Sequence, residues 1–113
     1  MGASSATRGP REAAAVIIEF AQIDSIDRGS GIVSVPLVTN AAVESPKFTS
    51  GLSLYPPGTG APRHVHNCDE QVTLLDGEAE VEIEGVVTEL GRFDTTYIPG
   101  AASTHFAIAA RSR

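Results

Sequence analysis

Hydrophobic and polar residues alternate most regularly over residues 78–84. Glutamates occupy positions 78, 80, 82 and 84, and Ala79, Val81 and Ile83 lie between them. This period of two predicts a half-buried β-strand whose acidic face points to solvent. The acidic row lacks the converging loop geometry of a calcium site and is typical of a soluble sheet surface. Glu84-Gly85 predicts a tight turn into a second strand at 86–90, and therefore a hairpin.

Short apolar runs separated by turn signals cover much of the remaining chain. Residues 13–20 combine helix-favouring alanines with Val16-Ile17-Ile18, and we interpret them as a strand from about Val16. Pro36 interrupts the next run and predicts an edge or bulged strand there. The expected strands after the first are residues 32–38, 48–55, 71–75, 93–98 and 106–110. Many short strands of this kind predict an all-β sandwich or barrel.

The length of 113 residues fits one domain and not two. Residues 1–12 are mainly Ala, Ser, Gly and Arg without periodicity, so we expect a disordered N-terminal tail followed by a folded domain over 13–113. The apolar run at 13–18 is shorter than a signal-peptide core or a membrane span. With a single cysteine in the chain, a cytoplasmic location is the expectation.

Charge narrows the classes of partner. The net charge is −6, and the isoelectric point is about 4.9. A nucleic-acid binder or a protein that docks on an anionic membrane needs a basic face, so neither partner is expected. One cysteine also excludes an internal disulfide framework and a CxxC zinc site.

Candidate metal-ligating residues follow from the three histidines. His64 and His66 form an H-x-H pair, and Glu70 follows four residues later. Side chains at i and i+2 of a strand lie on the same side, so both imidazoles can face one point. A tight turn at residues 67–69 would return the Glu70 carboxylate to that point. Imidazole and carboxylate together suit a borderline divalent metal, with His105 as the candidate fourth ligand.

The segment Gly58-x5-His64-x-His66-x3-Glu70-x6-Gly77 resembles the first motif of the cupin family at every fixed position. Five fixed positions coincide by chance in about one of 10⁵ chains of this length, given average residue frequencies. The resemblance covers residues 48–110 approximately, with motif one at 58–77 and motif two at about 91–109. It implies a single-domain jelly-roll barrel (double-stranded β-helix) that holds one metal ion. It also implies His64, His66, Glu70 and His105 as the metal ligands.

The second motif departs from the family pattern G-x5-P-x-G-x2-H-x3-N. Phe93 stands at the first glycine position and Ala109 at the final asparagine position. Pro99 is present, but one extra residue separates it from His105. One added residue in a strand turns every later side chain to the other face.

We expect the Gly100-Ala101-Ala102 segment to absorb this extra residue as a bulge. His105 would then point inward on one face with Ala107 and Ala109, and Phe106 and Ile108 would point outward. A slipped register would instead leave a three-ligand centre of His64, His66 and Glu70, similar to the facial triad of non-heme iron enzymes.

The implied cofactor is one divalent transition metal: Fe, Mn, Ni, Zn or Cu. Four such ligands leave two octahedral positions open. The first hypothesis is a dioxygenase-like oxidoreductase, dependent on iron or manganese, that acts on a small organic molecule through an enolate or hydroxyl oxygen. The alternatives are a metal-dependent isomerase that stabilises an enediolate, and a non-enzymatic module that binds a small ligand or only a structural metal. The sequence indicates no catalytic acid or base outside the ligand set.

Two further residues lie inside motif one. Cys68 is expected to be a turn residue, with a soft-metal ligand as the alternative, and Asp69 is the fallback carboxylate. Four of the aromatic residues in the matched region are expected in the core: Phe48, Tyr55, Tyr97 and Phe106.

Association is expected from the end of the chain. A cupin normally continues past the motif-two histidine with at least one more strand, whereas this chain stops soon after residues 106–110. An unfilled sheet edge, together with the strand that carries Pro36, predicts a homodimer in which each subunit covers the other.

Overall fold

The computed structural model describes residues 15–64, 67–100 and 106–110 of the chain. One short 3-10 helix, η2 (Phe20–Gln22), is followed within these residues by nine strands: β1 (Ile26–Gly29), β2 (Ile32–Pro36), β3 (Gly51–Leu54), β4 (Gly60–His64), β5 (Glu70–Thr73), β6 (Ala79–Ile83), β7 (Val86–Leu90), β8 (Thr95–Ile98) and β9 (Phe106–Ala110). The all-β prediction is therefore confirmed. Across the described ranges, no helix has the length and apolar character needed to cross a membrane.

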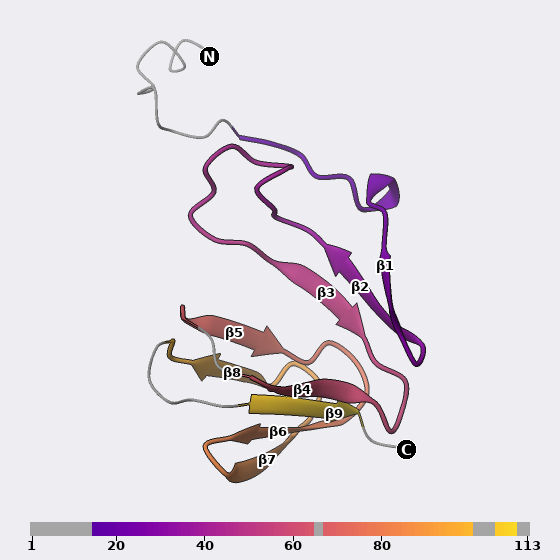
Figure 1. Cartoon of the computed structure of the whole chain (residues 1–113), viewed down its shortest axis with the longest axis vertical. Helices are drawn as coiled ribbons and strands as arrows, with labels where there is room; N and C mark the ends of the chain where they lie inside the picture. The colour runs from indigo at the N-terminus through magenta and orange to yellow at the C-terminus, as the bar shows by residue number, and fades with distance from the viewer. Residues whose placement is uncertain (1–14, 65–66, 101–105, 111–113) are drawn as a thin grey trace. The chain divides into compact units, whose positions relative to one another are not determined.

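The strands form three sheets (Figure 1). A three-stranded sheet has the order β1-β2-β3, a four-stranded sheet the order β4-β9-β6-β7, and a two-stranded sheet pairs β5 with β8. The chain forms two compact units: the first contains most of the three-stranded sheet, and the second contains residues 29–32 and everything from Tyr55 onward. All motif residues therefore belong to the second unit. The predicted boundary between a tail at 1–12 and a domain at 13–113 stays a prediction, because residues 1–14 lie outside the described residues.

Strand β6 shows the predicted alternation. Ala79 and Val81 are buried, whereas Glu80 and Glu82 are only half-buried. β6 is an inner strand of its sheet and pairs antiparallel with both β7 and β9. The backbone therefore finds hydrogen-bond partners on both sides while the side chains alternate between core and surface.

The hairpin between β6 and β7 is confirmed. Ile83 pairs with Val86, so Glu84 and Gly85 form a two-residue loop. Both loop residues have positive φ, 50° and 84° respectively. Positive φ at both positions is the geometry of a type I′ turn, whose twist matches that of the strands.

The core of the second unit lies between its sheets. Val81, Leu90 and Ile98 are buried, and the half-buried residues Val72, Leu74, Ile83 and Ile108 pack against them. Val81 and Ile98 are each only 1 % exposed. Complete burial of side chains of this size contributes about 1.5–3 kcal/mol each, so this small cluster is a main source of stability for the site-bearing unit.

The expected strand at Val16 is wrong. Residues 15–19 have no regular structure, and η2 follows at Phe20. Ile17 is 88 % exposed and Phe20 is 58 % exposed. A β-branched run becomes a strand only when a neighbouring strand supplies backbone partners and a surface to pack on. None of the described strands pairs with residues 15–19.

The placement of the Pro36 strand at a sheet edge is also wrong. β2 is the middle strand of its sheet and pairs with β3 in continuous register from Val33 to Pro36. Pro36 is tolerated because it is the last residue of β2, opposite Gly51. Pairing resumes past the proline, where the Leu37 N–H donates to the Ser50 carbonyl at 2.9 Å.

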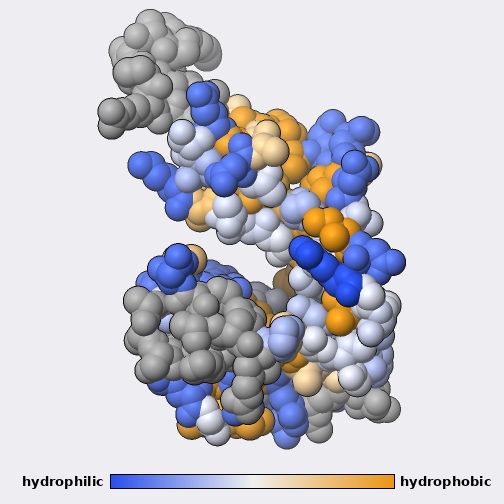
Figure 2. Space-filling view, viewed as in Figure 1, coloured by the Kyte–Doolittle hydropathy of each residue, from blue (hydrophilic) through white to orange (hydrophobic). Residues whose placement is uncertain are grey.

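The aromatic residues are less buried than expected. Phe48 and Tyr97 are each 67 % exposed, and Tyr55 is half-buried. The side chain of Phe106 lies outside the described residues. Apolar surface is also visible on the first unit (Figure 2), where Val16, Ile17, Phe20, Ile26, Phe48 and Leu54 are exposed. The core residues that the structure describes are accordingly aliphatic.

Candidate metal centre

The first motif histidine lies at the end of β4. His64 pairs with Phe106, the first residue of β9, and Phe106 pairs in turn with Ile83 on β6. Residues directly opposite each other in an antiparallel sheet share a face. Position 64 therefore belongs to the register row of Ile83, and Ile83 packs against the core. The side chain of His64 lies outside the described residues, as do the whole of His66 and His105.

A bulge precedes His64. Ala61 pairs with Ile108 and His64 with Phe106, so three steps along β4 match two steps along β9. One extra residue on β4 reverses the face of the positions that follow it. The bulge expected at Gly100-Ala101-Ala102 falls mainly on residues 101–102, which lie outside the described residues.

The predicted faces of β9 are wrong where the structure describes them. Ile108 packs against the core, and Ala109 is exposed. Ile108 pairs with the buried Val81, whereas Ala109 pairs with Glu80. The physical reason is burial: isoleucine carries far more apolar area than alanine, so the register with Ile108 inward is the stable one. Strand β9 begins at Phe106. Position 105 lies outside the strand, so the alternation of side chains along β9 does not assign it to a face.

Glu70 begins β5. It pairs with Ile98, the last residue of β8 and one of the most buried residues of the core. Glu70 is half-buried, and its Oε1 atom is buried. A carboxylate oxygen that is withdrawn from water beside an apolar core is better suited to bind a cation than one at a solvated surface position. The donor set predicted from the motif, imidazole plus carboxylate, is also the set that divalent transition metals accept.

Asp69 has a different role from the one expected of it. Its Oδ1 atom accepts a hydrogen bond from the Gly100 backbone N–H at 2.9 Å, and its Oδ2 atom accepts one from the Tyr97 hydroxyl. Both carboxylate oxygens are therefore engaged across the β5–β8 pair. This leaves Glu70, rather than Asp69, as the motif carboxylate for a metal. Sequence reasoning missed Tyr97 and Gly100, because only the register of β5 and β8 reveals that they face Asp69.

These hydrogen bonds shift the pKa values of Asp69 and Tyr97 in opposite directions. The Gly100 N–H, followed by the Tyr97 hydroxyl, lowers the pKa of the Asp69 carboxyl below its ordinary value, because both stabilise the ionised form. The same hydrogen bond raises the pKa of Tyr97, because a phenolate could no longer donate to the carboxylate. Asp69 is thus an ionised acceptor at neutral pH.

The glycines near the motif have distinct structural reasons. Gly58 and Gly77, the two fixed glycines of motif one, have φ of +82° and +84°. Residues that carry a side chain rarely adopt this left-handed backbone conformation. Gly100 instead packs closely on the backbone of Cys68, and a Cβ atom there would overlap that backbone.

Among the described residues, no three His, Cys, Asp or Glu side chains converge on one point. This follows from the described ranges, which contain the side chain of only one of the four predicted ligands, Glu70. Cys68 is exposed and has a free thiol.

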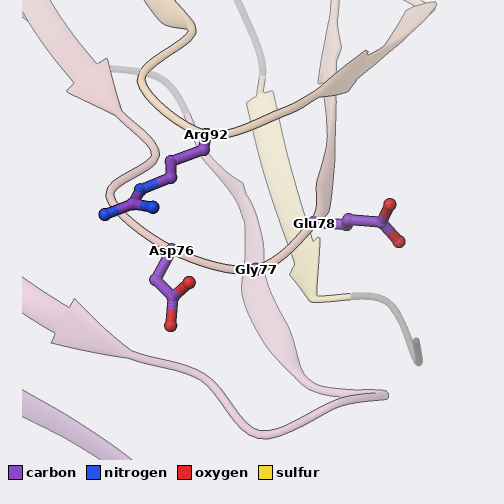
Figure 3. Close-up of a pocket in the computed structure, with 4 residues that line it drawn as sticks. All are labelled: Asp76, Gly77, Glu78 and Arg92. Atoms are coloured by element: carbon purple, nitrogen blue, oxygen red, sulfur yellow. The ribbon is translucent and has the colours of Figure 1, made fainter.

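A hollow of about 460 Å³ lies elsewhere in the second unit (Figure 3). It is lined by Asp76, Gly77, Glu78 and Arg92, and Glu78 points away from the other two charged side chains. These residues lie in or beside the β5–β6 and β7–β8 connections, beyond the end of β5 opposite to Glu70. None of the described residues that line the hollow is a predicted metal ligand.

The comparisons with known proteins agree with this fold. The model of the Cupin domain family matches residues 51–111. The structure of KdgF from a Halomonas species superposes with a TM-score of 0.72 at 20% identity, covering 88% of this chain and 84% of that one. The structure of an RmlC-like cupin from Shewanella frigidimarina superposes with a TM-score of 0.70 at 18% identity, covering 86% of this chain and 82% of that one.

The structure of a predicted oxalate decarboxylase from Thermotoga maritima superposes with a TM-score of 0.65 at 16% identity, covering 83% of this chain and 86% of that one. A search of curated proteins found no match. The solved structures are too distant in sequence to transfer an activity and establish the fold alone. The match of the family model covers more than half of the chain and includes both motifs, and on that ground the chain belongs to the cupin family and has its jelly-roll fold.

Proposed function

We propose that this cupin binds one divalent transition metal through His64, His66, Glu70 and His105. The observation that carries the proposal is the placement of Glu70, half-buried at the start of β5 with its Oε1 atom buried. The register row that joins position 64 to Ile83 supports it, because that row covers the core. His66 and His105 enter through the motif alone.

The proposed centre is an oxygenase-type active site for a small organic molecule. A metal bound there would act as a Lewis acid toward an enolate or hydroxyl oxygen. The residues of the chain hold the ligands in place: Glu70 supplies one negative charge, and the β5–β8 pairing fixes the backbone from which it projects. The aliphatic core formed by Val81, Leu90 and Ile98 provides the rigid support for β6 and β8.

Elemental analysis of the purified protein tests the centre before any substrate is chosen. We expect about one equivalent of a first-row transition metal per chain, because the three or four protein ligands together form a single binding site. His64→Ala and His66→Ala should each abolish binding, and Glu70→Gln should weaken it strongly. Glu89→Gln, an exposed glutamate on β7, is the matched control and should retain full occupancy. Full occupancy in the His64→Ala/His66→Ala double variant contradicts the proposal.

Oxygen consumption tests the reaction class. The metal-loaded protein should consume dioxygen with a vicinal diol or an enolisable ketone, and the Glu70→Gln variant should not. Isomerisation of such a compound without oxygen uptake would favour the isomerase. Stoichiometric binding without turnover would favour the non-enzymatic binding module.

A further inference from the structure

Asp69 joins two strands through a side chain that no sequence motif assigns. Its two carboxylate oxygens accept hydrogen bonds from Tyr97 on β8 and from Gly100 beyond the end of β8. These partners are separated from Asp69 by 28 and 31 residues in sequence. We name Asp69, Tyr97 and Gly100 together the Asp69 clamp.

The clamp lies directly beside Glu70. The β5–β8 ladder begins with the Glu70–Ile98 pair, and Tyr97 pairs with Gln71. Asp69 precedes this first pair and Gly100 follows it, so the hydrogen bond between them extends the contact between the two segments past the ladder. Gly100 also packs on the Cys68 backbone, where any side chain would overlap. The chain is therefore fixed on both sides of the Asp69–Glu70 peptide bond: Asp69 by its hydrogen bonds, and Glu70 by its pairing with Ile98.

We infer that Asp69 is a positioning residue for the metal centre, acting by fixing the backbone from which the Glu70 carboxylate projects. The inference rests on the proposed metal site. Glu70 is the first residue of its strand, and a strand end frays unless another contact holds it. Without the clamp, the Glu70 carboxylate would have to be ordered at the moment of metal binding, which lowers affinity.

The test compares metal binding by four variants of the full chain. Asp69→Ala removes both bonds, and Tyr97→Phe removes only the hydroxyl bond. Asp69→Asn keeps an oxygen acceptor for the Gly100 N–H and an amide group beside the Tyr97 hydroxyl. Asp94→Ala is the matched control, because the Asp94 carboxylate likewise accepts a glycine N–H, that of Gly91 at 2.8 Å, but in the β7–β8 connection.

The affinity for Co²⁺ and the visible absorption of bound Co²⁺ are measured for each protein, with the thermal unfolding of the metal-free form. We expect Asp69→Ala to weaken Co²⁺ binding about tenfold to a hundredfold, the usual cost of losing support for a ligand. Its Co²⁺ absorption bands should shift, since they report ligand geometry. Tyr97→Phe should show a smaller loss, and Asp69→Asn should recover most of the affinity. Asp94→Ala should bind Co²⁺ as the unaltered protein does.

The outcomes separate the two proposals. If the unaltered protein binds no Co²⁺, the metal centre and the clamp both fail. If it binds Co²⁺ and Asp69→Ala leaves affinity and spectrum unchanged, only the clamp is overturned. Equal losses in Asp69→Ala and Asp94→Ala would likewise overturn it, because they would show a general effect of stability. Should Asp69→Ala fail to fold, Tyr97→Phe decides: unchanged affinity and spectrum overturn the clamp.

Discussion

At the scale of single residues, the interactions around Asp69 show that the fallback carboxylate of the motif serves another purpose. Its carboxylate is an acceptor for Tyr97 and Gly100. Glu70, its neighbour, lies opposite the buried Ile98 instead. The division between the two adjacent carboxylates follows from strand alternation, which sends consecutive side chains to opposite faces.

The hydrogen bond between Tyr97 and Asp69 predicts an elevated phenol titration. The pKa of Tyr97 is raised, mainly by its bond to Asp69. This bond is therefore present below the ordinary tyrosine pKa of about 10 and is lost as pH rises through the higher folded value. Ultraviolet absorbance should show one of the two tyrosines ionising late. Replacing Asp69 by Asn should return that titration toward the ordinary value, and an unchanged titration would contradict the bond.

Gly100 predicts a steric effect at the same place. Gly100→Ala should destabilise the fold by about 1–3 kcal/mol, because the added methyl group overlaps the Cys68 backbone, which cannot rotate away. Gly91→Ala is the control, since its Cβ would meet only Asp94 Oδ2 at an ordinary 3.6 Å. Urea unfolding of both variants measures the difference. Equal stability of the two would show that the Cys68 segment yields readily.

At the scale of elements, β9 decides how β4 and β6 are joined. It lies between them in the four-stranded sheet and pairs with each. The bulge between Ala61 and His64 lets β4 change register along β9 without disturbing the β6 pairing. β9 therefore links the histidine motif to the core strand.

The faces of β9 can be tested by substitution. Ile108→Ala should lower the free energy of unfolding by about 2 kcal/mol, because Ile108 packs against the core but is only partly buried. Ala109→Ser should change it by less than about 0.5 kcal/mol, since Ala109 is exposed. Chemical denaturation provides both values. A larger loss of unfolding free energy for Ala109→Ser than for Ile108→Ala would instead support the faces expected from the sequence, with Ala109 inward and Ile108 outward.

At the scale of the whole molecule, exposed apolar residues predict association. β7 is the last strand of its sheet order, and its residues Val86 and Val87 are 67 % and 56 % exposed. An apolar edge strand is a template for pairing with another chain. We expect a homodimer, with a mass by light scattering of twice the 11.8 kDa of one chain. Val87→Lys should shift it toward monomer, and a stable monomer of the unaltered protein would contradict the prediction.

The sequence by itself determined the local features of this cupin. The alternation over 78–84, the Glu84-Gly85 turn and the strand at 106–110 are confirmed, because strand periodicity and positive-φ turns depend on near neighbours alone. The histidine motif likewise identified the family, since its fixed spacing is a property of one continuous segment.

Only the tertiary structure decided which residues meet across strands. It placed Pro36 in a middle strand, left Val16 and Ile17 outside regular structure, turned Ile108 inward, and brought Tyr97 and Gly100 to Asp69. Each of these depends on register between segments far apart in the chain. Register is set by the total burial of apolar area over all paired strands, a quantity that no single segment contains.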